Sequence, residues 1–214
     1  MYVPAHFEET RLEVLHDLVR NHPLATLVTL DRTGLNANHI PMELDPEPQS
    51  LGTLRGHVSR ANPMWRDFSS DVAALAIFQG PEIYITPSWY QTKQESGKVV
   101  PTWNYAVVHA YGPLRIVEDP AWLRALVGRL TDQHEAQRAE PWEVADAPND
   151  YIEGQLRGIV GIEIPVERLI GKWKVSQNRP EVDRKGVSRG LLELSKSNAA
   201  CMADLVDQAL RDQS

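Results

Sequence analysis

The sequence predicts an α+β fold that is mainly β: an antiparallel barrel or sandwich with peripheral helices and a C-terminal helix. Six or seven short strands are expected between residues 24 and 164, mostly in hairpin order, as in antiparallel sheets. Few helices interrupt them, and the glycine fingerprints of dinucleotide and P-loop folds are missing. Both observations disfavour a doubly wound parallel sheet.

The first elements follow from apolar spacing. Leu12, Leu15, Leu18 and Val19 repeat at helical spacing and predict a helix over residues 8–21. A β-branched run at 24–30, a turn at 31–34 and a strand at 35–44 then predict a hairpin, which a surface loop at 45–50 follows.

A strand at 51–58 and a short helix at 59–65 are expected next, followed by a buried strand at 72–79, a turn at Gly80-Pro81 and a strand at 82–86. A loop at 87–98 leads to one long strand or two over 99–117 and to a helix from Asp119-Pro120 through Leu130. The chain then continues with a polar loop at 135–149, a short helix at 151–157, a strand at 159–164 and a helix at 198–211. Aspartate followed by proline is a typical helix start, because proline suits the first helical position.

Composition bounds the class of protein. The chain has 214 residues, of which 42% are apolar, so it suits one large domain or a domain with an appendage. Its single cysteine, Cys201, allows no disulfide within the chain. The N-terminus lacks the basic start and apolar core of a signal peptide, and no apolar run approaches the ~18–20 residues of a membrane span. We therefore expect a cytoplasmic protein without membrane contact.

Charge is distributed unevenly. With 22 basic and 29 acidic residues the formal net charge is −7, which disfavours a protein that coats nucleic acid with its whole surface. Residues 167–196 carry eight basic and four acidic side chains, a net +4, so the remainder carries −11. The basic segment alone could meet phosphate.

The segment 54–63 is the first chemical motif. Ser59 and Arg60 stand where a strand is expected to pass into a helix, and free N–H groups at a helix start favour an anion. Arginine can grip phosphate through two parallel N–H bonds. The alternative is that Ser59 merely caps the helix and Arg60 is solvated.

Two other groups of residues could carry chemistry. Thr102, Trp103 and Asn104 open a strand, where an aromatic ring between polar neighbours could face a planar heterocycle, or Trp103 could belong to the core. Strand histidines His39, His57 and His109 could converge on a metal, but histidines in barrels are more often hydrogen-bonded core or rim residues. No Cys-x-x-Cys occurs, and we expect no metal site.

Several motifs together resemble the PaiB-type proteins, often called FMN-binding negative transcriptional regulators. The resemblance covers nearly the whole chain and is carried by residues 1–7, 56–63, 84–90, 100–105 and 171–180. It implies a split β-barrel of Greek-key-like, antiparallel strands, as in pyridoxamine-phosphate oxidases and flavin reductases. It also implies a homodimer with FMN in the groove between the subunits.

The resemblance implies site residues as well. The FMN phosphate would be held by Ser59 and Arg60, while Arg55, His57 and Asn62 would line the phosphate and the ribityl chain. Thr102, Trp103 and Asn104 would approach the isoalloxazine. Residues 1–170 would form the flavin-binding barrel, and residues 171–214 would form a basic segment and a C-terminal helix packed on the barrel or its partner.

The basic segment leaves three roles open. Its candidate contact residues are Lys172, Lys174, Gln177, Asn178 and Arg179. They could meet DNA phosphates, or fold over the flavin groove and hold phosphate or an acidic substrate, or dock on the acidic barrel.

Other functions stay open beside the regulator. A bound flavin does redox chemistry itself, so a flavin-dependent oxidoreductase without a role at DNA is one alternative. Its catalytic residues are not identified, although His57, His109 or Tyr105 could assist. The other alternative is a protein of the same fold that binds no flavin and functions in haem handling or in protein interaction.

Overall fold

The computed structural model describes residues 1–46 and 50–212, so residues 47–49 of the expected surface loop lie outside the described part. The chain divides into two compact units. The first unit comprises Met1–Leu18, Gln79–Val108 and Ile170–Ser214, and the second comprises Val19–Phe78 and His109–Leu169. Strands β5 (Ala74–Ile85), β6 (Thr102–Gly112) and β9 (Arg168–Lys174) contribute residues to both. The expected division at residue 170 stays a prediction.

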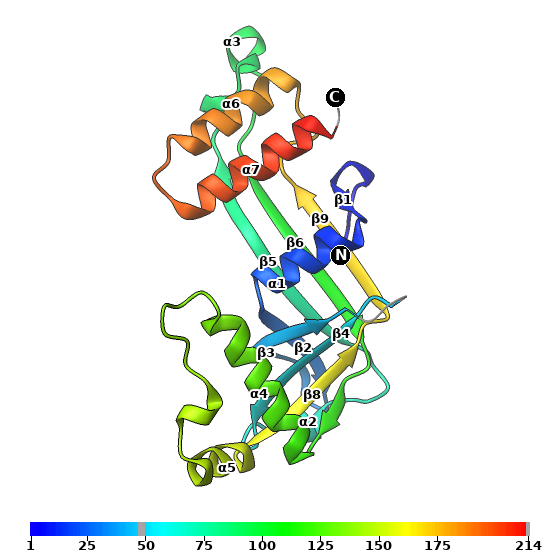
Figure 1. Cartoon of the computed structure of the whole chain (residues 1–214). Coiled ribbons are helices and arrows are strands. Elements are labelled where there is room, and N and C mark those ends of the chain that lie inside the picture. Colours follow the sequence, from blue (N-terminus) through cyan, green and yellow to red (C-terminus); the bar gives the residue numbers. More distant parts are fainter. Residues whose placement is uncertain (47–49, 213–214) are drawn as a thin grey trace. The chain divides into compact units, whose positions relative to one another are not determined.

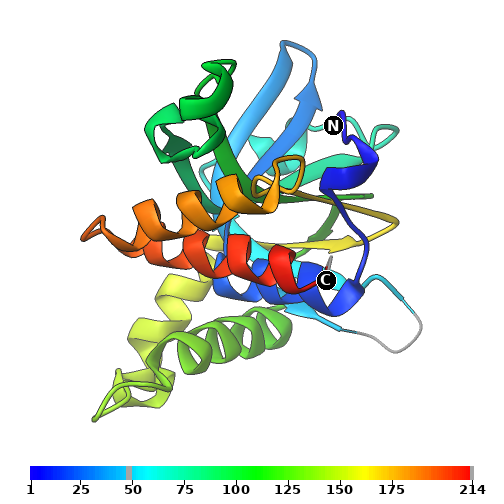
Figure 2. The same cartoon turned by 90° about the horizontal axis from the view of Figure 1, so that it is seen from above.

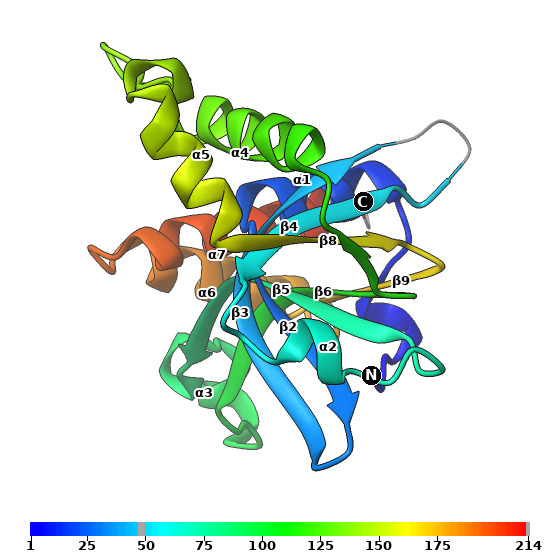
Figure 3. The same cartoon turned by 90° about the horizontal axis from the view of Figure 1, so that it is seen from below.

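The second unit is built on antiparallel pairs in the order β5-β2-β3-β4-β8-β7. Figure 3 labels these strands except β7. Besides β5, its strands are β2 (Leu24–Asp31), β3 (Gly34–Asp45), β4 (Thr53–Ser59), β7 (Arg115–Val117) and β8 (Ile159–Pro165). In β4, Leu54, Gly56 and Val58 are buried, whereas Arg55, His57 and Ser59 alternate with them on the opposite face. That opposite face is where the predicted phosphate residues lie.

The β2–β3 hairpin confirms the predicted turn. The backbone N–H and the hydroxyl of Thr33 both donate to Asp31 Oδ1, at 2.7 and 2.6 Å. Gly34 has φ of +124°, a conformation that side chains with a Cβ rarely adopt. The register then follows, with Leu30 opposite Leu35 and Thr26 opposite His39.

Helices α2 (Met64–Asp67), α4 (Pro120–Glu135) and α5 (Asn149–Arg157) complete the second unit, together with the short turn η3 (Val144–Asp146). Asp119 caps α4 as predicted, since its side chain accepts from the N–H groups of Ala121 and Trp122. Leu123 of α4 packs with Ile152 and Leu156 of α5 in a small apolar cluster.

The first unit joins a short sheet to a helical pair. Its strands follow the order β1-β9-β6-β5, where β1 is Glu8–Glu9. Helices α6 (Glu181–Leu192) and α7 (Ser197–Arg211) lie side by side (Figures 1 and 2). The other helices are η1 (Ala5–Phe7), α1 (Leu12–Asn21, which ends in the second unit), η2 (Pro87–Trp89) and α3 (Thr92–Ser96). The predicted C-terminal helix is confirmed.

The segment around Gly80-Pro81 differs from its prediction. We expected two strands joined by a turn, and β5 runs unbroken through both residues. A Cβ at position 80 would lie 2.9 Å from Leu18 and 3.1 Å from the carbonyl of Ala106, so the glycine permits close packing. Pro81 lies beyond Leu75–Ile77, the part of β5 that pairs with β2, and its missing N–H breaks no bond of that pairing.

The basic segment contains elements that the sequence pattern did not indicate, namely β9 and α6. Gly186 and Gly190 of α6 lie against Trp89, and a Cβ at either position would overlap its backbone or its indole. Buried Asp183 accepts from the N–H and the hydroxyl of Thr92, at 3.0 and 2.7 Å. These contacts hold the 87–98 segment on α6.

The predicted α+β class is confirmed. Among the described residues, no helix is both long enough and apolar enough to cross a membrane.

Candidate functional site

The outer face of β4 borders a cavity of about 480 Å³ in the second unit. It contains three of the predicted cofactor residues, His57, Ser59 and Asn62. The rest of its lining comes from Val58 of β4, from β3, from the end of α5 and from the start of β8, the last three contributing Asn38, His39, Ile40, Pro41, Gln155, Gly158 and Ile159. The polar groups are therefore hydroxyls, amides and imidazoles.

His57 is the least satisfied group of this cavity. Its Nδ1 is buried and has no hydrogen-bond partner among the described residues. Burial also lowers the pKa of the imidazole below its ordinary value, which favours the neutral ring at neutral pH. Buried polar atoms without a partner are costly, so this nitrogen is suited to a ligand that offers it a hydrogen bond.

The turn from Ser59 to Met64 differs from the expected helix start. Helix α2 begins only at Met64, and it has a single turn. The N–H of Ala61 donates to Ser59 Oγ at 3.3 Å, and that of Met64 donates to Asn62 Oδ1 at 3.0 Å. The side chain of Asn62 also donates to Asn38 Oδ1 at 2.8 Å. The N–H groups of Ala61 and Met64 are thus occupied by side chains of the same turn, and the anion site expected at Ser59 and Arg60 stays a prediction.

Arg60 turns its guanidinium away from this cavity. It pairs with Glu118 at 2.7 Å and donates to the carbonyls of Arg157 and Ile159, at 3.1 and 3.2 Å. Its side chain and that of Glu118 are 36% and 56% exposed, so the ion pair is a surface pair of little stability.

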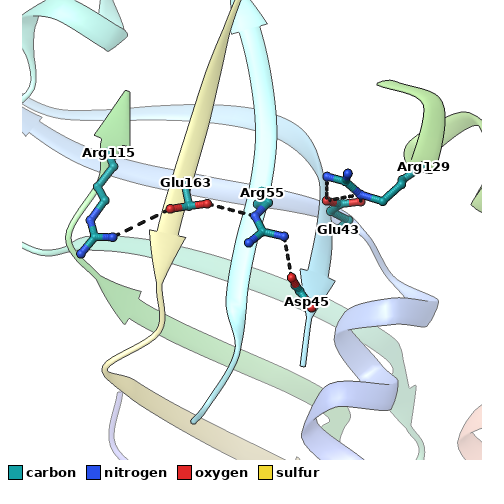
Figure 4. A network of polar contacts seen from close by, with 6 residues as sticks. All are labelled: Glu43, Asp45, Arg55, Arg115, Arg129 and Glu163. Atoms are coloured by element: carbon teal, nitrogen blue, oxygen red, sulfur yellow. Dashed lines mark hydrogen bonds and ion pairs between the residues drawn. The ribbon is translucent and has the colours of Figure 1, made fainter. Parts of the chain in front are cut away.

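Arg55 is engaged in a polar network on the same face of β4 (Figure 4). Its guanidinium contacts Asp45 at 2.6 Å and Glu163 at 3.0 Å, and Arg115 approaches Glu163 at 3.9 Å. Nearby, Arg129 of α4 holds Glu43 at 2.6 Å. Arg55 does not line the cavity, and two carboxylates occupy the donors that the resemblance assigns to FMN.

The predicted isoalloxazine residues lie at the start of β6, in the first unit. Lys174 donates to the Thr102 hydroxyl at 2.5 Å, and Asn104, fully buried, exchanges hydrogen bonds with Ser176 at 3.0 and 3.3 Å. Ser176 has φ of +68°, so this buried pair holds a sparsely populated backbone conformation. Asn104 therefore stabilises the interior of the first unit through its hydrogen bonds to Ser176.

Trp103 has the opposite character. It is 51% exposed, and its ring meets that of Tyr84 edge to face, with centroids 6.1 Å apart. Tyr84 is itself 46% exposed. An exposed aromatic pair of this kind could meet a planar ring, and the core alternative for Trp103 is wrong.

The candidate contacts of the basic segment are largely engaged within the first unit. The Gln177 amide accepts from the N–H of Val175 at 2.7 Å and donates to the carbonyl of Trp173 at 2.6 Å. Lys172 donates to the carbonyl of Tyr2 at 3.0 Å, and Arg179 lies 4.8 Å from the ring centroid of Tyr90. Burial lowers the pKa of Lys174, and its cationic neighbours add to this. Asn178 is exposed.

The cavity also contains residues that the sequence did not indicate as flavin contacts: Asn38, His39 and Gln155. Alternation of polar residues along 36–40 could have placed Asn38 on one face, but nothing local marks Gln155. His39 and His57 line the same cavity, whereas His109 lies near Tyr111 instead. Among the described residues, no group of three metal-ligating side chains occurs.

Comparison with known families and proteins matches the sequence resemblance. A family model described as "Putative FMN-binding domain" matches residues 1–168. "Protease synthase and sporulation protein PAI 2" of Bacillus subtilis is 33% identical over the full length of both chains. Uncharacterized protein AN0679 of Emericella nidulans is 36% identical over 96% of each chain.

Solved structures show the fold. Conserved hypothetical protein Rv2991 of Mycobacterium tuberculosis has a TM-score of 0.57 at 13% identity, covering 85% of this chain and 95% of that one. The FAD and heme binding protein of Mycobacterium smegmatis has a TM-score of 0.55 at 16% identity, over 78% and 73% of the two chains. The family model and the Bacillus subtilis relative confirm the resemblance and FMN as the cofactor, and the solved structures confirm the fold.

Proposed function

The chain belongs to the PaiB-type family with its FMN-binding domain, and we propose that it binds FMN in the cavity on the outer face of β4. The buried Nδ1 of His57, which has no partner among the described residues, is the observation that carries this proposal. The Ser59 hydroxyl lines the same cavity and can still donate, while its oxygen accepts from Ala61. The volume of about 480 Å³ lies in the usual range of small-molecule clefts.

The phosphate of FMN needs a cation beyond this neutral lining. Arg60 follows Ser59 directly, and its present partner Glu118 is a surface carboxylate. Exchanging such a pair costs about 0–1 kcal/mol, whereas a charge-assisted bond to phosphate contributes ~1.5–3 kcal/mol. We therefore expect the guanidinium to leave Glu118 and to bind the phosphate when FMN enters.

An FMN titration followed by flavin fluorescence tests the proposal. Arg60→Gln should weaken FMN binding about 10- to 100-fold, because it removes the charged contact. His57→Leu should weaken it about 2- to 10-fold, because it removes one neutral hydrogen bond.

Arg66→Gln is the matched control. Arg66 is exposed, its guanidinium lies 4.2 Å from the ring centroid of Trp65, and it does not line the cavity. A wild-type chain that fails to bind FMN would refute the proposed function. Wild-type affinity in Arg60→Gln would refute the phosphate assignment alone.

A homodimeric, cytoplasmic regulator is the finer form of this proposal. Its regulator role is supported by the alignment with the Bacillus subtilis protein, which includes residues 170–214, beyond the FMN-binding domain. In the basic segment, Lys185 and Arg189 are exposed on α6 and Lys196 is exposed just before α7; Lys185 forms a surface ion pair with Glu181, which contributes little. These three side chains are better placed to meet DNA phosphates than the half-buried Lys172 and Lys174.

A further inference from the structure

A second cavity of the second unit lies between α4, α5 and the side chain of Arg60, and its volume is about 730 Å³. Apart from Arg60 and Glu118, its lining residues take no part in the site proposed for FMN. Its lining consists of apolar residues and a charged rim: Pro120, Ala121, Leu123, Leu156, Arg60, Glu118, Arg124, Glu153 and Arg157. The volume suits a small molecule, since ligand clefts measure roughly 300–1,000 Å³.

The floor of this second cavity is apolar and firmly packed. Leu123 and Leu156 are only 2% and 8% exposed and belong to the cluster that joins α4 to α5. Trp122 and Val127 pack against the same cluster. Pro120 and Ala121 are exposed and add accessible apolar surface above this floor, on which a ligand can bury an apolar body.

The rim carries an excess of one positive charge, with three arginines against two glutamates. Glu118 pairs with Arg60 at 2.7 Å. Arg124 donates to the neutral Asn149 side chain at 2.8 Å, and Asn149 in turn donates to Glu153 at 3.0 Å. Among the described residues, no carboxylate forms an ion pair with Arg157. A ligand with one negative charge complements this rim.

We propose that the second cavity binds an amphipathic monocarboxylate, with its apolar body against Pro120 and Ala121, above Leu123 and Leu156, and its carboxylate between Arg124 and Arg157. Arginine is the side chain best suited to this anion, because its planar fork matches the two carboxylate oxygens.

Arg60 connects this cavity to the cavity proposed for FMN. The side chain of Arg60 lines the second cavity. Its backbone N–H donates to the carbonyl of Gly158 at 2.8 Å, and its guanidinium donates to the carbonyl of Ile159 at 3.2 Å. Gly158 and Ile159 line the first cavity. A carboxylate in the second cavity attracts Arg60 away from the FMN phosphate. This step rests on the proposed function, and it makes the two ligands weaken each other's binding.

Calorimetric titration of the full FMN-free chain with 4-phenylbutyrate tests the site. We expect saturable binding that is about tenfold weaker or worse for the neutral 4-phenylbutanamide, because a charge-assisted contact is lost. The double variant Arg124→Gln/Arg157→Gln should lose binding of the acid by about tenfold or more. Thermal unfolding of the variant should match the wild type, because both side chains are exposed.

Arg138→Gln is the control, because Arg138 is an exposed arginine outside the cavity and pairs with Glu135. The proposed site is wrong if millimolar 4-phenylbutyrate gives no binding heat, if the amide binds equally well, or if the double variant binds like the wild type.

The link through Arg60 is tested by repeating the FMN titration with saturating 4-phenylbutyrate. Couplings of this kind are typically about 5- to 150-fold, so we expect the FMN dissociation constant to rise by about fivefold or more. An unchanged constant overturns the link. A chain that binds 4-phenylbutyrate but no FMN supports the second cavity while it refutes the proposed function.

Discussion

At the residue scale, His57 and the two arginines beside it show how neighbours decide the use of a side chain. The three residues lie within six positions of one another on or just after β4. Arg55 is neutralised by Asp45 and Glu163, Arg60 turns toward Glu118, and His57 keeps a buried ring nitrogen without a partner among the described residues. Residue type alone makes both arginines candidate phosphate ligands. The two carboxylates around Arg55 disfavour it, whereas Arg60 has a single surface carboxylate and remains the proposed ligand.

The depressed pKa of His57 leads to a prediction about stability. The unfolded imidazole has a pKa of about 6.5 and the folded one a lower value, because burial disfavours its charged form. As the pH falls below about 6.5, the unfolded state binds the proton first, so the folded state loses stability until the folded pKa is passed.

His57→Leu should therefore reduce the pH dependence of the free energy of unfolding on the acid side of neutrality. One group contributes at most about 1.4 kcal/mol per pH unit. Urea unfolding at a series of pH values measures this slope. Part of it should remain, because burial also lowers the pKa of His22 and His109. His134→Gln, at an exposed position near the end of α4, is the control, and an equal slope in His57→Leu and wild type would contradict the prediction.

At the element scale, local rules succeed where an element is set by its own residues. The hairpin turn at 31–34 and the cap at Asp119 are local, and both were predicted from a few neighbouring side chains. Gly80-Pro81 was predicted as a turn because this dipeptide usually punctuates strands. Its true role depends on Leu18 and Ala106, which are distant in sequence, so no local pattern could have indicated it.

The packing of α4 on β8 gives a prediction at this scale. A Cβ at Gly161 of β8 would overlap the Trp122 ring and lie 3.0 Å from the carbonyl of Val117. Gly161→Ala should therefore destabilise the protein by about 1–3 kcal/mol, as overpacking does.

Gly128→Ala is the opposite control for this packing. Gly128 lies within α4 and a Cβ there has no neighbour within 4 Å, so alanine should stabilise the helix by about 0.5–1 kcal/mol. Denaturant unfolding measures the free energy of unfolding of both variants. A Gly161→Ala protein as stable as wild type would show that α4 does not pack closely on β8.

At the scale of the whole molecule, a net charge of −7 conceals two differently charged parts. The basic segment contributes β9, α6 and the residues that lead into α7, and several of its cations are used inside the first unit. Lys172 and Lys174 make hydrogen bonds there, whereas Lys185, Arg189 and Lys196 are exposed. DNA binding, which belongs to the proposed regulator role, would use these exposed cations.

The regulator proposal predicts retention of specific duplexes when the FMN-loaded protein is incubated with promoter DNA of its source and an excess of competitor. Lys185→Gln/Arg189→Gln/Lys196→Gln should lower the slope of log affinity against log salt by about 0.9 per lost phosphate contact. Lys93→Gln/Lys98→Gln removes exposed charge outside the basic segment and should leave the slope unchanged. If no duplex survives the competitor, the regulator role is refuted and FMN binding is unaffected.

The sequence by itself determined the antiparallel α+β fold and the family with its FMN cofactor, and it grouped His57, Ser59 and Asn62, which line one cavity in the structure. These features depend on local patterns and on motifs long enough to be specific. Only the tertiary structure decided which of the candidate side chains remain available. Asn104 and Gln177 are used in internal hydrogen bonds, Arg55 is held by carboxylates, and Gln155 enters the cavity from a distant helix. The physical reason is that hydrogen bonds and ion pairs depend on neighbours in space, and a chain pattern does not specify those neighbours.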